Sequence, residues 1–208
     1  MCKIVIIGGG GHARVIIDTL KMSGEYEIVG ILDPQLETGT NISEVNVLGD
    51  DNLLEELFKK GVNNACIAVG SIKDNIKRKI LYERVKQTGF SIPSLTHPQS
   101  IMSTNVKISE GVQIMAGAIL QAGSLIGENT IVNTGSIIEH DCYIGRHVHI
   151  CPGVVISGGC EIHEGAFIGA GATVIQGIKI GKNVLVGAGS VVIRDVPNDS
   201  KVMGVPAK

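Results

Sequence analysis

A repeat of six residues in the second half of the chain constrains the fold more than any other feature. Every sixth residue from Ile108 to Val192 is a branched aliphatic, which makes fifteen consecutive positions without a gap. The residue two places before each aliphatic is mostly small, and glycine recurs between the aliphatics, as at Gly117 and Gly135. A period of six fits neither an α-helix nor an isolated strand with alternating faces.

The period fits a short strand plus a turn, laid along one side of a triangular coil. Three sides give a coil of eighteen residues, and such coils stack about 4.8 Å apart by parallel pairing. The chain is 44% hydrophobic but only 3% aromatic, so its core must be filled with Ile and Val. The pattern resembles the hexapeptide-repeat left-handed parallel β-helix, with the aliphatics pointing inward and glycine at the corners.

The first half reads as strands that alternate with helices. We expect a helix after the glycine run at 8–11, further helices near 52–60 and 75–88, and strands at 3–7, 27–32 and 65–69. This alternation is typical of a small parallel sheet of Rossmann type. The sequence therefore predicts an α/β Rossmann-like domain over residues 1–95 and an all-β parallel β-helix over residues 96–208, with the connection at 91–97.

Glycines after the first strand and an acid after the second form a candidate ligand site. The glycine run lets the backbone approach a phosphate, and the following helix supplies unpaired N–H groups at its N-terminus. Asp33 ends the second strand and is placed to bind ribose hydroxyls. A tight turn without a ligand is the alternative. A dinucleotide site is weakly supported, since the glycine spacing is loose and no second mononucleotide-binding half follows.

Charge and hydropathy exclude several classes of partner. The formal net charge is −2, which gives no indication of a nucleic-acid partner or of binding to an anionic membrane surface. No apolar run approaches the length of a membrane span, and no signal peptide is evident. The five cysteines form no C-x-x-C pair, which favours a reduced compartment. We expect a cytoplasmic protein without membrane insertion.

Three motifs, in order, resemble one family. They are the glycine-rich stretch Ile6–Arg14, the segment Ile138–Cys142 with its Glu-His-Asp sequence, and the terminal Gly204–Lys208. Together they resemble the sugar O/N-acyltransferase family, which includes UDP-4-amino-sugar (bacillosamine-type) N-acetyltransferases and sialic-acid O-acetyltransferase-like proteins. The resemblance implies an acetyl-CoA-dependent sugar acetyltransferase with acetyl-CoA as co-substrate and no metal. It also implies a nucleotide-sugar acceptor and a homotrimer with active sites between subunits.

The Glu-His-Asp corner is the candidate catalytic site. His140 lies two residues past the inward Ile138, on a corner where packing needs no imidazole. Histidine suits a general base because its ordinary pKa lies near neutral pH, and an attacking amine or hydroxyl must lose a proton. The resemblance implies that His140 is this base and that Asp141, where many relatives carry Glu, orients the imidazole.

One glycine is predicted beside this base by the coil length alone. Gly158 lies eighteen residues after His140, so it stacks one coil further, where it opens space and offers an N–H to the thioester oxygen. The resemblance implies the same contact. It further implies acetyl-CoA contacts for His149, on the outward side of its strand, and for Ala170 and Ala188. The implied acceptor contacts are Gly10, Gly11, His12, Asp33, Gly70 and Asn133.

The remaining histidines and the repeat cysteines have structural interpretations. We expect His147 and His163 to be solvated surface residues. Cys142 and Cys160 lie eighteen residues apart at the small inward position, so we expect a buried stacked pair without redox chemistry.

Four functions compete for this sequence. N-acetylation of a UDP-4-amino-4,6-dideoxy sugar by direct transfer is the leading hypothesis, and O-acetylation of a sialic-acid-like sugar is second. A metal-dependent carbonic anhydrase needs three clustered histidines, yet no two of the histidines at 140, 147, 149 and 163 are eighteen apart. A non-enzymatic scaffold would not need the glycine run, Asp33 or the Glu-His-Asp corner.

Overall fold

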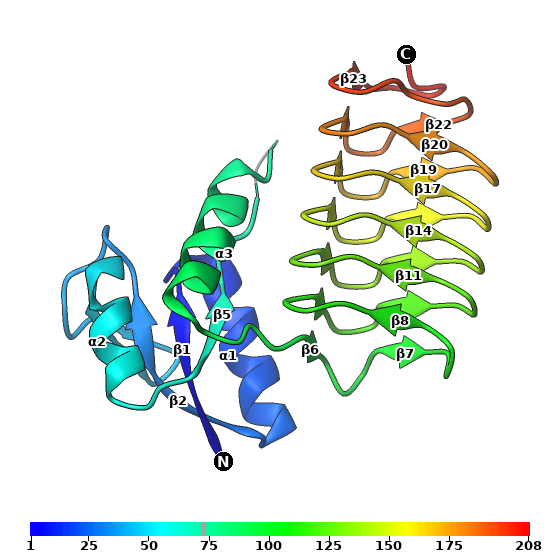
Figure 1. Cartoon of the computed structure of the whole chain (residues 1–208). Helices are drawn as coiled ribbons and strands as arrows, with labels where there is room; N and C mark the ends of the chain where they lie inside the picture. Colours follow the sequence, from blue (N-terminus) through cyan, green and yellow to red (C-terminus); the bar gives the residue numbers. More distant parts are fainter. Residues whose placement is uncertain (72–73) are drawn as a thin grey trace. The chain divides into compact units, whose positions relative to one another are not determined.

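The chain forms two compact units, which Figure 1 draws in a computed structural model that describes residues 1–71 and 74–208. The first unit comprises Met1–Gly70 and Lys77–Leu95. The second comprises Ser71–Ile76 and Thr96–Lys208.

The first unit is built on a five-stranded sheet with the order β3-β4-β2-β1-β5. The strands are β1 (Cys2–Ile7), β2 (Tyr26–Leu32), β3 (Asn41–Ile42), β4 (Val45–Gly49) and β5 (Asn64–Ile67). The helices are α1 (Gly11–Ser23), η1 (Asp51–Leu53), α2 (Leu54–Lys59) and α3 (Ile76–Thr88). All neighbours pair in parallel except β3 and β4, so the predicted Rossmann-like alternation is confirmed.

The central strand explains why this unit is an α/β layer structure. Ile4 to Ile7 of β1 are fully buried, as expected of a strand covered on both faces. The antiparallel hairpin of β3 and β4 was not predicted. Its turn residues Ser43 and Glu44 have φ of 49° and 71°, a left-handed conformation that usually calls for Gly or Asn. The turn therefore carries none of the residues that mark a hairpin.

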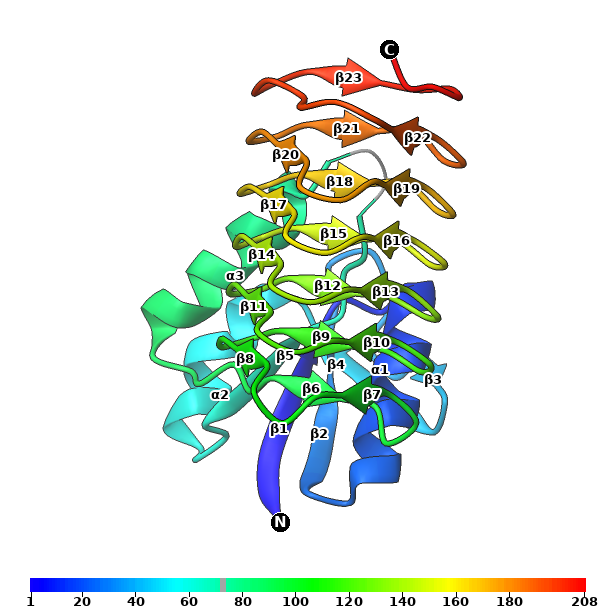
Figure 2. The same ribbon diagram turned by 90° about the vertical axis from the view of Figure 1, so that its right-hand side faces the viewer.

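The second unit consists of three parallel sheets made of two-residue strands, seen as stacked coils in Figure 2. One sheet holds β7 (Ile101–Met102), β10 (Ile119–Leu120), β13 (Ile137–Ile138), β16 (Val155–Ile156), β19 (Thr173–Val174) and β22 (Val191–Val192). The next holds β8 (Lys107–Ile108), β11 (Leu125–Ile126), β14 (Tyr143–Ile144), β17 (Glu161–Ile162) and β20 (Lys179–Ile180). The third holds β6 (Leu95–Thr96), β9 (Gln113–Ile114), β12 (Ile131–Val132), β15 (His149–Ile150), β18 (Phe167–Ile168), β21 (Leu185–Val186) and β23 (Lys201–Val202).

The register of these sheets repeats the coil length read from the sequence. Ile119 pairs with Ile137, and Ile137 pairs with Val155. Every sixth aliphatic from Ile114 to Val192 is buried, and only the first member of the series, Ile108, is partly buried. The predicted left-handed parallel β-helix is therefore confirmed, with one continuous aliphatic core.

Two expectations from the sequence concern the state of the cysteines and the absence of membrane-spanning helices. All five cysteines are free thiols, and Cys142 and Cys160 are buried in the β-helix core as expected. Within residues 1–71 and 74–208, no helix combines the length and the hydrophobicity that crossing a bilayer would require.

Candidate functional site

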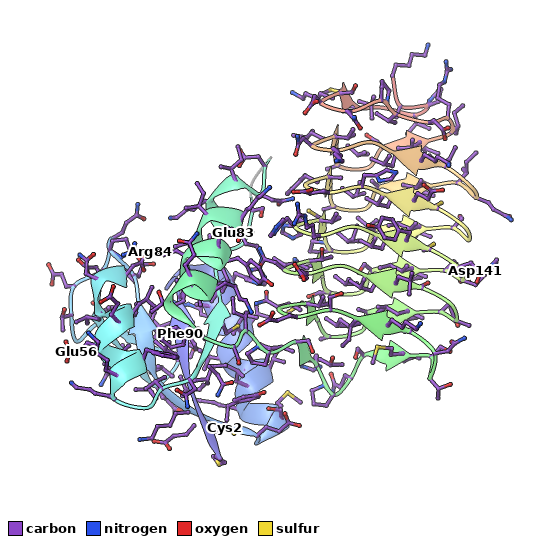
Figure 3. All side chains as sticks on the ribbon, viewed as in Figure 1. Cys2, Glu56, Glu83, Arg84, Phe90 and Asp141 are labelled. Atoms are coloured by element: carbon purple, nitrogen blue, oxygen red, sulfur yellow. The ribbon has the colours of Figure 1, made fainter. Side chains whose placement is uncertain are left out.

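His140 and Asp141 form the turn between β13 and β14, and Figure 3 shows the Asp141 side chain projecting from the edge of the β-helix. His140 Nδ1 lies 3.0 Å from Asp141 Oδ2, and both side chains are exposed. Asp141 has a φ of 58°, a left-handed conformation that Asp adopts more readily than most residues. A carboxylate accepts, so Nδ1 carries the hydrogen and Nε2 keeps a lone pair for a proton.

Gly158 lies directly beside that lone pair. A methyl group added at Gly158 would come within 2.5 Å of His140 Nε2, so only glycine leaves the imidazole its place. The flanking amides are used, since Ser157 N donates to Val174 O at 3.0 Å and Gly159 N donates to His140 O at 2.8 Å. The N–H of Gly158 has no acceptor in the described part of the chain. The corner thus combines a base with a free N–H donor.

The glycine loop and Asp33 meet in the first unit. Gly9 N donates to Asp33 Oδ2 at 2.7 Å, and Gln35 N donates to Asp33 Oδ1 at 2.8 Å. Gly10 is the N-cap of α1 and offers no side-chain cap to the helix. Gly10 and Gly11 are exposed, and no atom approaches the places where their Cβ would be. The positive end of the α1 dipole therefore faces open space that suits an anion.

The other predicted acceptor contacts of this unit lie at the same sheet edge. A Cβ at Gly70 would lie 3.5 Å from the Cβ of His12, which is the second residue of α1. The loops in question follow β1, β2 and β5, and β1 lies between the other two in a parallel arrangement. Carboxyl ends of parallel strands share one edge, so the unit gathers Gly10, Gly11, His12, Asp33 and Gly70 there.

Asn133 and His149 come together on the β-helix. Asn133 Nδ2 lies 3.3 Å from His149 Nε2, and Asn133 Oδ1 accepts from Thr134 N at 2.8 Å. The ring of His149 packs edge-on against Phe167, with centroids 5.3 Å apart. His149 is only 5% exposed, although it lies on the outward side of β15. The acetyl-CoA contact of His149 stays a prediction.

Ala170 and Ala188 lie at another corner of the coil. They are exposed in the turns that follow β18 and β21, and they are stacked, since Gly189 N donates to Ala170 O at 2.8 Å. Asn133 is in the equivalent turn after β12. His140 and Gly158 occupy the turns after β13 and β16 instead. Within one chain, the predicted acetyl-CoA contacts are therefore divided between two corners.

One prediction about the histidines was wrong. His147 is 1% exposed, and its Nδ1 lies 2.9 Å from Asn129 Nδ2. Asn75 lies against the same residue, since Asn75 Nδ2 donates to His147 O at 2.8 Å. The eighteen-residue spacing of Asn129 and His147 could have revealed the stacked pair. His163 is half-exposed, as expected, with Nε2 3.5 Å from Glu161 Oε2.

The β-helix also has an open hollow on one face, apart from the predicted site residues. An open hollow of about 610 Å³ lies on the face formed by β8, β11 and β14, and none of the predicted site residues lines it. It is lined by charged side chains of both signs, among them Lys107, Glu128 and Arg146. In the part of the chain that is described, no three His, Cys, Asp or Glu side chains are grouped closely enough to hold a metal ion.

Family models match both units. The model for the PglD N-terminal domain matches residues 3–85, and the model for the bacterial transferase hexapeptide (six repeats) matches residues 123–158 and 159–194. The curated UDP-N-acetylbacillosamine N-acetyltransferase of Bacillus subtilis is 36% identical over 116 residues. That stretch is 56% of this chain and 52% of the relative, so it spans about half of the relative's length.

Solved structures match over the whole chain. PerB from Caulobacter crescentus, in complex with CoA and GDP-perosamine, is 40% identical with a TM-score of 0.92, covering 100% of this chain and 97% of that one. The acetyltransferase domain of PglB from Neisseria gonorrhoeae, in complex with acetyl coenzyme A, is 36% identical with a TM-score of 0.91. The latter match covers 99% of this chain and 98% of that one.

Proposed function

We propose that this chain, which belongs to the nucleotide-sugar N-acetyltransferases of the hexapeptide-repeat family, transfers the acetyl group of acetyl-CoA directly to the amino group of a nucleotide-linked 4-amino-4,6-dideoxy sugar. Acetyl-CoA is the co-substrate. The observation that carries the proposal is the His140 corner, where an imidazole held by Asp141 stands beside the free N–H of Gly158. These are the two groups that acetyl transfer from a thioester requires.

The proposed step runs without a covalent enzyme intermediate. The neutral amine attacks the thioester carbonyl carbon, and His140 Nε2 takes the proton that the nitrogen must lose as the new bond forms. The carbonyl oxygen becomes an oxyanion, which the N–H of Gly158 stabilises. When the oxyanion collapses, the carbon–sulfur bond breaks and CoA leaves as a thiolate. The His140 imidazolium then returns a proton to that sulfur.

Asp141 supports the base in two ways. Its carboxylate holds the tautomer in which Nε2 is free, and it stabilises the imidazolium that forms during the reaction. The distance of 3.0 Å between Nδ1 and Oδ2 shows that the shorter acid reaches the ring within one chain. A partner subunit is not needed for this contact.

The first unit is proposed to hold the nucleotide part of the acceptor. The open N-terminus of α1 suits the pyrophosphate, and the Asp33 carboxylate beside Gly9 suits ribose hydroxyls. Acetylation at nitrogen is favoured over oxygen because the relatives that match most of the chain carry names of N-acetyltransferases or are crystallised with GDP-perosamine. The Bacillus subtilis relative is named for a UDP-linked sugar, and PerB is crystallised with a GDP-linked one, so UDP and GDP are both candidate nucleotides.

The division of predicted acetyl-CoA contacts between two corners supports assembly. The His140 corner of one copy and the Ala170 corner of another can face the same CoA molecule, whereas the two corners of one copy lie on either side of the sheet that contains β13 and β16. We therefore propose a homotrimer with active sites between subunits. Light scattering at micromolar concentration should report a trimer. A monomer that is fully active would contradict the shared site.

A panel of nucleotide-linked sugars tests the function. CoA release should be seen with a UDP- or GDP-linked 4-amino-4,6-dideoxy sugar, and mass spectrometry of the product should locate the acetyl group on nitrogen. The same sugars with a hydroxyl in place of the amine are the matched controls. Thermal shift with UDP, GDP and CMP identifies the nucleotide, because a ligand that binds only the folded state raises its stability. CoA release with sialic-acid-like sugars alone would replace N-acetylation by O-acetylation.

A further inference from the structure

Three buried side chains share one inward column directly under the catalytic corner. Ser124, Cys142 and Cys160 follow one another at intervals of one coil, and each is at most 1% exposed. Each donates to a carbonyl fifteen residues further along the chain. Ser124 Oγ donates to Glu139 O at 2.8 Å, Cys142 Sγ to Ser157 O at 3.3 Å, and Cys160 Sγ to Ile175 O at 3.1 Å.

The acceptor of Cys142 is part of the peptide that carries the free N–H of the site. The carbonyl of Ser157 and the N–H of Gly158 belong to one planar group, so a bond that holds the oxygen also fixes the direction of the N–H. The sulfur of Cys142 lies 3.7 Å from His140 O as well, so it stands between the two turns that form the site. Cys160 donates to Ile175 O and its sulfur also lies 3.9 Å from Gly158 O, so Cys160 stands near the site as well. Thr130 makes the same kind of bond in another inward column, donating to Gly145 O at 2.8 Å, and the Gly145–Arg146 peptide belongs to no predicted site.

The thiol of Cys142 keeps the hydrogen that this bond needs. The ordinary pKa of a cysteine thiol is about 8.5, and burial disfavours the charged thiolate. The group is therefore protonated at neutral pH. A carbonyl oxygen is a stronger acceptor than a thiol sulfur, and Ser157 O is the nearer of the two carbonyls that Cys142 approaches.

We propose that Cys142 is a positioning residue for acetyl transfer, whose S–H aims the Gly158 N–H at the thioester oxygen by anchoring the Ser157–Gly158 peptide. The inference rests on the proposed function and adds a residue to it. A donor aimed at the developing oxyanion contributes only if it is already in place, and small displacements of such a donor reduce its effect. Cys142 acts from the core and touches neither substrate.

Three variants separate positioning from packing. Cys142→Ala removes the donor, Cys142→Ser restores one, and Thr130→Val removes the equivalent donor in another inward column. Serine fits this column, because Ser124 already makes the same bond there. We expect kcat to fall about 3- to 10-fold in Cys142→Ala. It should return to within about 2-fold of wild type in Cys142→Ser and remain unchanged in Thr130→Val. The Tm should fall in both Cys142→Ala and Thr130→Val, since both lose a buried hydrogen-bond donor.

Binding supplies a second readout that does not depend on the acceptor sugar. Calorimetry should show that wild type prefers acetyl-CoA over CoA, which lacks the thioester carbonyl, and that Cys142→Ala loses part of this preference while Thr130→Val retains it. Equal kcat in wild type and Cys142→Ala, or equal losses in Cys142→Ala and Thr130→Val, would overturn the proposal. If wild type binds no acetyl-CoA, the proposed function fails. A changed NMR shift of the Gly158 amide nitrogen in Cys142→Ala alone would then still support the anchoring role, because that nitrogen responds to hydrogen bonding at the Ser157 carbonyl of the same peptide, and an unchanged shift would refute it.

Discussion

The two units of this chain bring their site residues together in different ways. In the β-helix, residues that stack on adjacent coils are eighteen residues apart, so the coil length places Gly158 beside His140. In the α/β unit, Asp33 and Gly9 meet because two adjacent parallel strands end at one sheet edge, with no fixed interval between them. A periodic fold thus specifies contacts from sequence alone, whereas a layered fold specifies an edge at which contacts form.

The two units also differ in the chemistry that their site residues provide. The β-helix corner supplies a base and an N–H donor, which act in the transition state. The α/β edge supplies an open helix N-terminus and a carboxylate, which recognise a ligand. Substitutions in the second unit should therefore lower kcat, and substitutions in the first should raise the KM of the acceptor.

The largest effect is expected at the base. His140→Ala should lower kcat by about 10²- to 10⁴-fold, because the attacking amine loses its proton acceptor. The KM for both substrates should change little, as measured by steady-state kinetics of CoA release. His163→Ala is the matched control, since it removes a half-exposed histidine from the same β-helix. Near-normal turnover of His140→Ala would show that the chemistry lies elsewhere.

A smaller loss is expected from crowding the base. Gly158→Ala should lower kcat by about 10²-fold, because its methyl group would come within 2.5 Å of His140 Nε2 and displace the ring. The backbone of Gly158 is not left-handed, so the change adds a methyl group without backbone strain. Circular dichroism should show the wild-type spectrum. A fully active variant would mean that the imidazole does not work in this position.

The smallest of the three effects is expected in the first unit. Asp33→Ala should raise the KM for the sugar nucleotide about 10-fold, because the Gly9 and Gln35 amides lose a charged acceptor and the ribose loses a partner. The KM for acetyl-CoA should be nearly unchanged. Asp18→Ala, on an exposed position of α1, is the control. An effect on acetyl-CoA alone would reverse the division of labour between the units.

Much of the β-helix could be predicted because its period is a physical constraint on every residue. The inward aliphatics, the stacked cysteines and the place of Gly158 all follow from the coil length. The period does not predict which residues pack against the outside of the coil. Asn75, which is 72 residues away in sequence, donates to His147 O. No spacing within the repeat predicts the contact between Asn75 and His147.

Two further features could not be predicted from the sequence, namely the contact made by the Asp141 side chain and the turn of the β3–β4 hairpin. Asp141 occupies a left-handed corner position at which the repeat places Gly135 and Gly159, so the period predicts the turn. It does not predict that the Asp141 carboxylate reaches the imidazole of His140. The β3–β4 hairpin turns on Ser43 and Glu44, which lack the Gly or Asn that marks such turns. In this hairpin the backbone adopts a conformation that local preference alone would not select.

The division of labour between the two units is tested most directly by a double-mutant cycle on kcat/KM for the sugar nucleotide. His140→Ala and Asp33→Ala should act on different steps, so their losses should multiply in the double variant to within about 2-fold. A double variant no slower than His140→Ala alone would contradict separate roles for the two units. That result would mean that both residues serve one step and that acceptor recognition is not separate from the chemistry of the β-helix.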